Sequence, residues 1–190
     1  MQKERGILSP EGVKNMENLS DLVSSQKGGL QKLVEKIPGI KGYQKLEDRR
    51  DTDKIVRDNI AQRFNEQWGR ISAIEKDLSK GSGIVYLSDL ESAALKIRQF
   101  ADRIKTAAYG YAGLFDAVKV DDVALQQMYD YDLYLFDLAD AVKKSIDKVE
   151  DSVAANDGID GAIKELNKTA QECITALDRR AEVKLGTQNL

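Results

Sequence analysis

Hydrophobic residues recur along most of this chain at alternating intervals of three and four positions, which is the spacing of one face of an α-helix. No run alternates apolar and polar residues in the way that is typical of a β-strand. Only two prolines occur, Pro10 and Pro38, so the sequence after Pro38 is free of the strongest helix breaker. The pattern predicts an all-α protein with long helices at about residues 43–78, 88–119, 121–155 and 162–184.

A short helical pair is expected before these long helices. The first member opens with Ser9 and Pro10, and the second covers residues 30–36 and ends before a turn at Pro38. Long helices joined by short turns are expected to run up and down, because a short connection reaches only an antiparallel neighbour. The prediction is an elongated antiparallel bundle of four long helices at residues 43–190, preceded by the short helices and the Pro-Gly turn in residues 1–42, all within one domain.

The expected core is a stripe of apolar residues on each long helix. One position of the first stripe is ambiguous, because either Trp68 or Gln67 fits the spacing. The other predicted inward positions are Ile60, Phe64, Ile71, Ile74 and Leu78 in the first helix, Leu90, Ala94, Ile97, Ala101, Ile104 and Ala108 in the second, Leu125, Met128, Leu135, Leu138, Val142, Ile146, Val149 and Val153 in the third, and Ile163, Leu166, Ala170, Cys173, Leu177 and Ala181 in the fourth. The connections between helices include a linker at residues 79–83 and a turn at residues 156–161.

The stretch TAAYGYAGLFDAVKVDD, residues 106–122, packs two glycines and three aromatic residues into a few positions. The helical spacing continues through Tyr111 and Phe115. Burial of these aromatic side chains offsets the roughly 2 kcal/mol that Gly110 and Gly113 together cost a helix. A helix that continues through both glycines to about residue 119 is the preferred interpretation, and a break at the glycines is the alternative.

The net charge of −3 hides two regions of opposite sign. Residues 27–50 hold seven basic and three acidic residues, a net charge of +4, whereas residues 121–140 hold six aspartates and no base, a net charge of −6. We expect these regions to meet, either within one fold or head to tail between two copies. Arg49 and Arg50 are candidates for that contact. The acidic total argues against a nucleic-acid partner.

The composition removes most catalytic chemistry. The chain contains no histidine, and therefore no Ser-His or Cys-His nucleophile pair and none of the usual zinc or di-iron ligand sets. Cys173 lies in the stripe of the last helix and is expected to be a small buried hydrophobe. No glycine-rich phosphate loop and no calcium loop fits the glycine spacings. We expect a non-catalytic protein without a cofactor, a metal or a small-molecule substrate.

Four aspartates lie close together in the third long helix, at Asp130, Asp132, Asp137 and Asp140. Asp132 falls where the core stripe would take an apolar residue, so it needs a basic partner, a tyrosine hydroxyl or a metal ion. The preferred interpretation is a solvated acidic face with one partnered aspartate. The alternative is a carboxylate-only site for Mg²⁺ or Ca²⁺.

Residues 30–45 are basic and amphipathic. We expect this segment to pack on the bundle, and the alternative is docking on an anionic membrane surface. The first residues lack the apolar core and cleavage site of a signal peptide, and no apolar run approaches the length of a membrane span. Because the single cysteine also suits a reducing compartment, we expect a cytoplasmic protein.

Two motifs carry a resemblance to other proteins. The first is I-P-G-x-x-G-Y followed by E-x-R-R in residues 37–50, and the second is Y-G-Y-A-G-x-F-D-A-V-K in residues 109–119. With both motifs, the chain resembles a group of uncharacterised bacterial all-helical proteins. The resemblance implies a shared fold, and it implies that the two motifs form one structural feature, but it implies no activity. Gly110 and Gly113 would then receive the first motif, or form a notch in which another chain docks.

The sequence as a whole predicts a helical scaffold or assembly protein that binds a protein partner or self-associates. The candidate interaction surface combines the two motifs. It consists of Tyr43, Arg49, Arg50, Tyr109, Gly110, Tyr111, Gly113 and Phe115.

Overall fold

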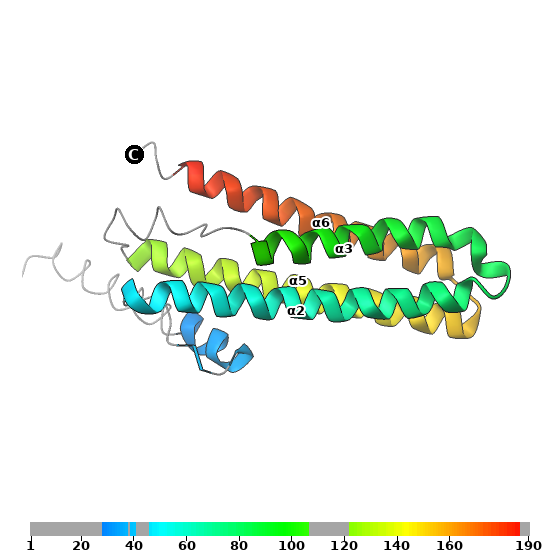
Figure 1. Ribbon diagram of the computed structural model, residues 1–190, viewed down its shortest axis with the longest axis horizontal. Helices are drawn as coiled ribbons and strands as arrows, with labels where there is room; N and C mark the ends of the chain where they lie inside the picture. Colours follow the sequence, from blue (N-terminus) through cyan, green and yellow to red (C-terminus); the bar gives the residue numbers. More distant parts are fainter. Residues whose placement is uncertain (1–27, 38, 41–45, 107–121, 187–190) are drawn as a thin grey trace, which may run out of the picture.

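The computed structural model describes residues 28–37, 39–40, 46–106 and 122–186, with side chains for all of these except 46–50, 122–128 and 179–186. Helices make up nearly all of the described chain and no strand occurs in it, so the prediction of an all-α protein is confirmed. After a short helix at residues 28–36, the elements are α2 (Leu46–Leu78), the 3-10 helix η1 (Ser82–Tyr86), α3 (Leu87–Thr106), α5 (Asp122–Ala155) and α6 (Ile159–Gly186) (Figure 1).

The four long helices lie side by side along the long axis of the molecule (Figure 1). Helix α2 packs against α3 and α5, and α6 packs against the same two helices. Residue numbers run in opposite senses across the α2–α3 and α5–α6 contacts, so each of these pairs is an antiparallel hairpin. The defining contacts are Phe64–Phe100 (ring centroids 4.1 Å apart) and Arg57–Lys105 (3.3 Å) in the first hairpin, and Ser145–Thr169 (3.2 Å) and Lys148–Glu165 (2.5 Å) in the second.

The two hairpins meet through helices that run parallel. Residue numbers rise together across α2–α5, with a constant offset of 77, and they also rise together across α3–α6. The contacts are Arg63–Asp140 and Arg70–Asp147 between α2 and α5, and Lys96–Asn167 and Arg103–Asp178 between α3 and α6. The predicted antiparallel neighbours are therefore found within each hairpin and not between hairpins. Short connections join α2 to α3 and α5 to α6, and these are the pairs that pack antiparallel.

The core follows the predicted stripes. Where side chains are described, the predicted inward positions are buried, except Val153, which is partly buried. The predicted positions Ala108, Leu125, Met128 and Ala181 lie outside the described side chains. The ambiguity in α2 is resolved in favour of Gln67, which is 8% exposed. The buried amide of Gln67 accepts a hydrogen bond from Arg70 Nη1 at 2.9 Å, which meets part of its need for a partner. Trp68 is half-buried instead, and its ring lies 4.9 Å from the guanidinium carbon of Arg98, a cation–π distance. Phe100 joins the core from outside the predicted stripe.

Three helix boundaries differ from the prediction. The short N-terminal helix already includes residues 28 and 29, and α3 begins at Leu87, directly after η1. Helix α6 begins at Ile159 and not at residue 162, because Asn156 (φ +53°) and Gly158 (φ +67°) complete the chain reversal in a shorter turn than expected. The first predicted helix and the connection through residues 107–121 lie outside the described residues.

Candidate functional site

The interaction surface predicted from the sequence falls outside the part of the chain whose side chains are described. Arg49 and Arg50 lie in the first residues of α2, at positions 46–50, for which the structure describes the backbone but not the side chains. The remaining members are not described at all, and they are Tyr43, Tyr109, Gly110, Tyr111, Gly113 and Phe115. That surface, and the continuity of the helix through its glycines, therefore stay predictions.

The four aspartates of α5 do not form a metal site in the structure. Asp132 is buried at 1% exposure, as its position in the stripe predicts, whereas Asp130 and Asp137 are exposed and Asp140 is half-buried. Among the side chains of residues 28–40, 51–106 and 129–178 that are described, no group of three or more carboxylates, thiols or imidazoles is placed to hold a metal ion. The geometry thus offers no support for the Mg²⁺ or Ca²⁺ alternative.

The basic and acidic regions of the chain meet within one fold. Lys36, at the end of the short helix, forms ion pairs with Asp140 at 3.3 Å and Asp137 at 3.7 Å. Arg63 of α2 also pairs with Asp140, at 3.3 Å. Both cations lie over the ring of Phe136, at 5.7 Å for the Lys36 ammonium and 4.8 Å for the Arg63 guanidinium. The prediction that these regions face each other is confirmed at Lys36.

Most apolar side chains described in residues 30–45 face the bundle, as the preferred interpretation of this segment predicts. Leu33, Ile37 and Ile40 belong to the same buried core as the long helices, and Val34 is exposed. Gly39 adopts a φ of +95°, as the predicted Pro-Gly turn requires. The described part of residues 30–45 therefore lacks the free apolar face with which an amphipathic helix enters a membrane surface.

Arg70, in the last third of α2, links the two hairpins. Its guanidinium donates to both carboxylate oxygens of Glu150, at 3.0 and 2.5 Å, and to Asp147 at 2.6 Å. These hydrogen bonds, that to Glu150 first, raise the pKa of Arg70. The pKa of Asp147 is lowered by its hydrogen bond to Lys143 and then by that to Arg70. A two-pronged contact of this kind fixes the register of α2 against α5.

Buried charge gathers near the starts of α2 and α5. Asp53 and Arg57 form an ion pair at 2.9 Å, and both side chains are nearly inaccessible to water. Arg57 also donates to the carbonyl of Lys105 at 3.3 Å, near the C-terminus of α3. The offset of 77 places buried Asp132 level with Ile55, between the two members of the pair. This end of the bundle is thus held by polar contacts in a region where the core would otherwise be apolar.

The opposite end of the molecule consists of two turns, residues 77–86 between α2 and α3 and residues 153–159 between α5 and α6, and we call it the tip (Figure 1). Ile84 and Val85 of η1 are 62% and 71% exposed, the highest values among the large apolar side chains that the structure describes. A Cβ atom on Gly83 would lie 2.6 Å from Leu78 Cδ2 and 3.1 Å from the Leu78 carbonyl oxygen. Glycine therefore lets η1 close onto the end of α2 while its two apolar side chains remain in solvent.

The α5–α6 turn has the geometry of a Schellman motif. Asn156 takes the left-handed conformation, Asp157 N donates to Ser152 O at 3.1 Å, and Asn156 N donates to Val153 O at the same distance. Two carbonyls at the end of α5 are satisfied in this way. These two hydrogen bonds hold the turn in one conformation, and its residues form one side of the space beside η1.

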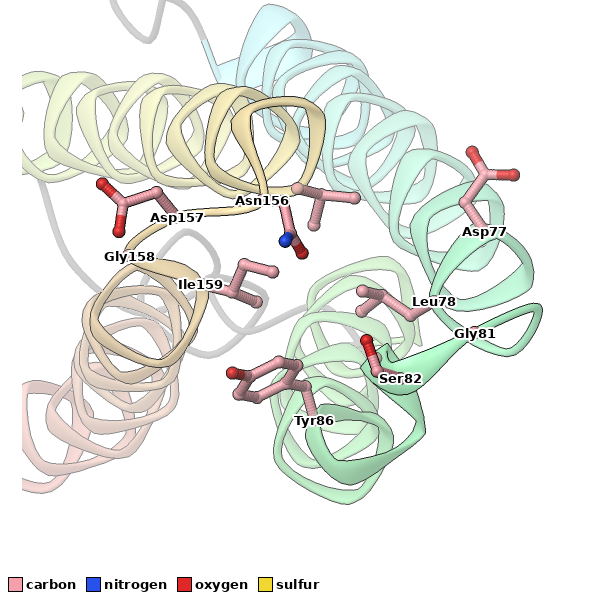
Figure 2. A pocket seen from close by; sticks show the side chains of 11 residues that line it. Asp77, Leu78, Gly81, Ser82, Tyr86, Asn156, Asp157, Gly158 and Ile159 are labelled. Carbon is pink, nitrogen blue, oxygen red and sulfur yellow. The ribbon is translucent and has the colours of Figure 1, made fainter.

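Between the two turns lies a cleft of about 560 Å³ (Figure 2). Its apolar floor is formed by the buried side chains of Leu78 and Ile159 and by the half-buried ring of Tyr86, which point toward one another. The carboxylates of Asp77 and Asp157 lie at opposite rims and point away from the floor (Figure 2). The exposed lining of the cleft is mainly polar, with a small apolar area at its base and two carboxylates at its rims.

Acidic residues are concentrated on the helix ends that form the tip. Residues 75–91 contain four acidic and two basic residues, and residues 149–163 contain four acidic residues and no basic residue. The pKa of Glu75 is raised by burial and then by the neighbouring carboxylate of Glu91. Lys80 balances Asp77 at 2.8 Å, in a contact that is open to solvent.

Sequence reasoning missed the tip, because it predicted only a linker at residues 79–83 and a turn at residues 156–161. Apolar residues in a short turn have no periodicity, so the helical spacing of apolar residues does not reveal them. The available signal was the run Ile84-Val85-Tyr86 directly after a glycine-rich linker, where polar residues are usual.

None of the helices in the described ranges carries an apolar stretch long enough to cross a membrane. The predicted resemblance to bacterial all-helical proteins stays a prediction, and the geometry of the tip carries the functional argument. Comparison with protein-family models, with curated proteins and with solved structures found no match for this chain.

Proposed function

We propose that this protein is a non-catalytic helical scaffold, an elongated bundle of four long helices that holds a protein partner at its tip. The observation that carries the proposal is the adjacent pair Ile84 and Val85, which is exposed although the large apolar residues of the long helices are mostly buried. Covering apolar surface gives about 25 cal/mol per Å², so exposed neighbours of this kind are a ready source of binding energy.

The contacts between the hairpins support a scaffold role. Arg70 ties α2 to α5, and close to the tip the Asn167 amide of α6 donates to the Asp89 carbonyl of α3 at 2.7 Å. A tip that is held from both sides loses little conformational freedom when a partner binds, which lowers the entropic cost of association. The histidine-free composition and the single buried cysteine agree with a non-catalytic protein of the cytoplasm.

Peripheral membrane binding through residues 30–45 is the weaker alternative, because Leu33, Ile37 and Ile40 are buried. Flotation with vesicles containing an anionic lipid at low salt tests it directly. We expect the protein to remain in the soluble fraction, and flotation that is lost in a Lys32→Glu variant would restore the membrane alternative.

The proposal is tested by purifying the protein from native cells with chemical cross-linking, beside an Ile84→Ser/Val85→Ser variant. The matched control is Leu95→Ser, because Leu95 of α3 is similarly exposed at 60% but lies outside the tip. We expect one protein, or a second copy of the chain, to co-purify with the wild type and with the control but not with the tip variant. Purified components should then reconstitute the complex in size-exclusion chromatography with light scattering.

Two results would contradict the proposal. One is a compact, inert monomer that captures nothing in any form of the experiment. The other is a partner that binds the tip variant as well as the wild type, which would place the interface elsewhere, for example on the surface predicted from the two sequence motifs.

A further inference from the structure

We infer that the tip binds a basic amphipathic helix of a partner protein, with its apolar face on Ile84 and Val85 and its basic residues against the acidic rim of the cleft. The inference rests on the proposed function, and it adds the chemical class of the partner. It follows from three features that occur together at the tip, namely the apolar pair, the cleft and the charge.

The charge selects the sign of the partner. Asp157 stands at one rim of the cleft and Asp77, in an exposed ion pair with Lys80, at the other. Asp89 and Glu91 follow on the first turns of α3. Complementary charge at the rim of an interface speeds association and suppresses partners of the same sign. A second copy joined tip to tip would bring these acidic rims together, and an anionic membrane or a nucleic acid would be repelled by them.

The cleft selects the shape of the partner. Its volume of about 560 Å³ is too small to enclose a helix but suits one long side chain that projects from it. A lysine or arginine would lay its methylene stem on the ring of Tyr86 while its charged end reaches the Asp157 carboxylate at the rim. Ile84 and Val85, on the turn beside the cleft, would then meet the apolar residues one helical turn away.

The test uses the full-length protein and two synthetic helical peptides that carry leucine on one face. In one peptide the other face is lysine, and in the second it is glutamate. Binding is measured by titration calorimetry, and the contacted residues are located by amide chemical-shift changes. We expect the lysine peptide to bind, with shift changes in residues 77–91 and 153–160, and the glutamate peptide not to bind.

Two matched variants separate local charge from total charge. Asp77→Asn/Asp157→Asn removes two negative charges at the tip, and Asp58→Asn/Glu172→Gln removes two from exposed positions on α2 and α6. We expect the tip variant to weaken binding of the lysine peptide about tenfold and the distant variant to change it less than twofold. Ile84→Ser/Val85→Ser should also weaken binding about tenfold, and circular dichroism checks its fold.

Equal weakening by the two charge variants would overturn the inference, since binding would then depend only on overall charge. Failure of the lysine peptide to bind, or shift changes outside the tip, would overturn it as well. If the serine variant does not fold, the comparison of the tip and distant charge variants still tests whether the lysine peptide binds at the tip. A native partner that is lost with the serine variant but kept with Asp77→Asn/Asp157→Asn would refute the basic helix and leave the scaffold proposal standing.

Discussion

Among the described glycines, Gly83 is the one at which an added side chain would meet its neighbours most closely. A methyl group there would meet Leu78 at 2.6 Å, and the buried position of Leu78 limits its movement. We expect Gly83→Ala to lower the free energy of unfolding by about 2 kcal/mol through overpacking, measured by urea denaturation. The control is Gly81→Ala, because nothing lies within 4 Å of that position. Equal effects of the two substitutions would show that the close contact with Leu78 does not affect the free energy of unfolding.

Cys173 gives a second test at this scale. The sequence predicts a small buried hydrophobe, and the thiol is indeed buried, which raises its pKa to about 12. Because the thiolate is the nucleophile, alkylation at pH 8 should be about a thousandfold slower in the folded protein than in the unfolded chain. Mass spectrometry after iodoacetamide treatment, with and without urea, measures the two rates. Similar rates would mean that the α6 stripe opens readily in the native state.

At the scale of elements, the contact between α2 and α5 makes stability depend on pH. Hydrogen bonds first to Lys143 and then to Arg70 lower the pKa of Asp147 in the folded state. The ionised carboxylate therefore stabilises the folded state at pH values above 3.8, the ordinary pKa of the group. This contribution is lost as the pH falls through that value toward the lower folded pKa. Urea midpoints of the wild type and of Asp147→Asn should therefore differ at pH 6, and the difference should shrink as the pH falls below 3.8.

The control for this pH effect is Asp151→Asn, because Asp151 is an exposed acid on the same helix. Its midpoint should follow that of the wild type over the whole range. A difference between wild type and Asp147→Asn that is constant with pH would mean that the substitution acts through packing and not through charge.

The long helices were predictable because their residues repeat a local rule many times. Each of Phe64, Ile97, Val142 and Leu166 falls on a stripe that sequence spacing alone defines, and each is buried. Helix ends were less certain, since the start of α6 depends on the conformations of Asn156 and Gly158, which no periodicity encodes. Periodicity also does not reveal which helix a stripe faces, so the parallel contacts between hairpins appear only in the structure.

The candidate site was least predictable, for two physical reasons. Ile84 and Val85 lie in a short 3-10 turn, where exposure depends on how η1 folds back on Leu78 and not on helical phase. The cleft joins residues 77–86 to residues 153–159, which are far apart in sequence and meet only because α2 and α5 run parallel. Parallel packing thus places both turns at one end.

At the scale of the whole molecule, the arrangement of hairpins has a direct consequence. Helix α2, with 33 residues, is about 50 Å long, and its contacts with α5 keep one register along it. In a ring of consecutively adjacent helices, α2 would lie beside α6 and diagonally across from α5. The two arrangements therefore predict different cross-links, from α2 to α5 in the observed arrangement and from α2 to α6 in the ring.

Paired cysteines on a Cys173→Ala background distinguish the two arrangements. Arg63 and Asp140 meet at 3.3 Å, so Arg63→Cys/Asp140→Cys should form an intramolecular cross-link with a short bismaleimide. Arg63→Cys/Glu172→Cys joins α2 to an exposed position on α6, across the diagonal, and should not. Mass spectrometry of the monomer band identifies the linked peptides. If only the second pair were linked, α2 would lie beside α6 and not beside α5. The two turns would then not form the cleft, and the proposal of a binding site at the tip would be wrong.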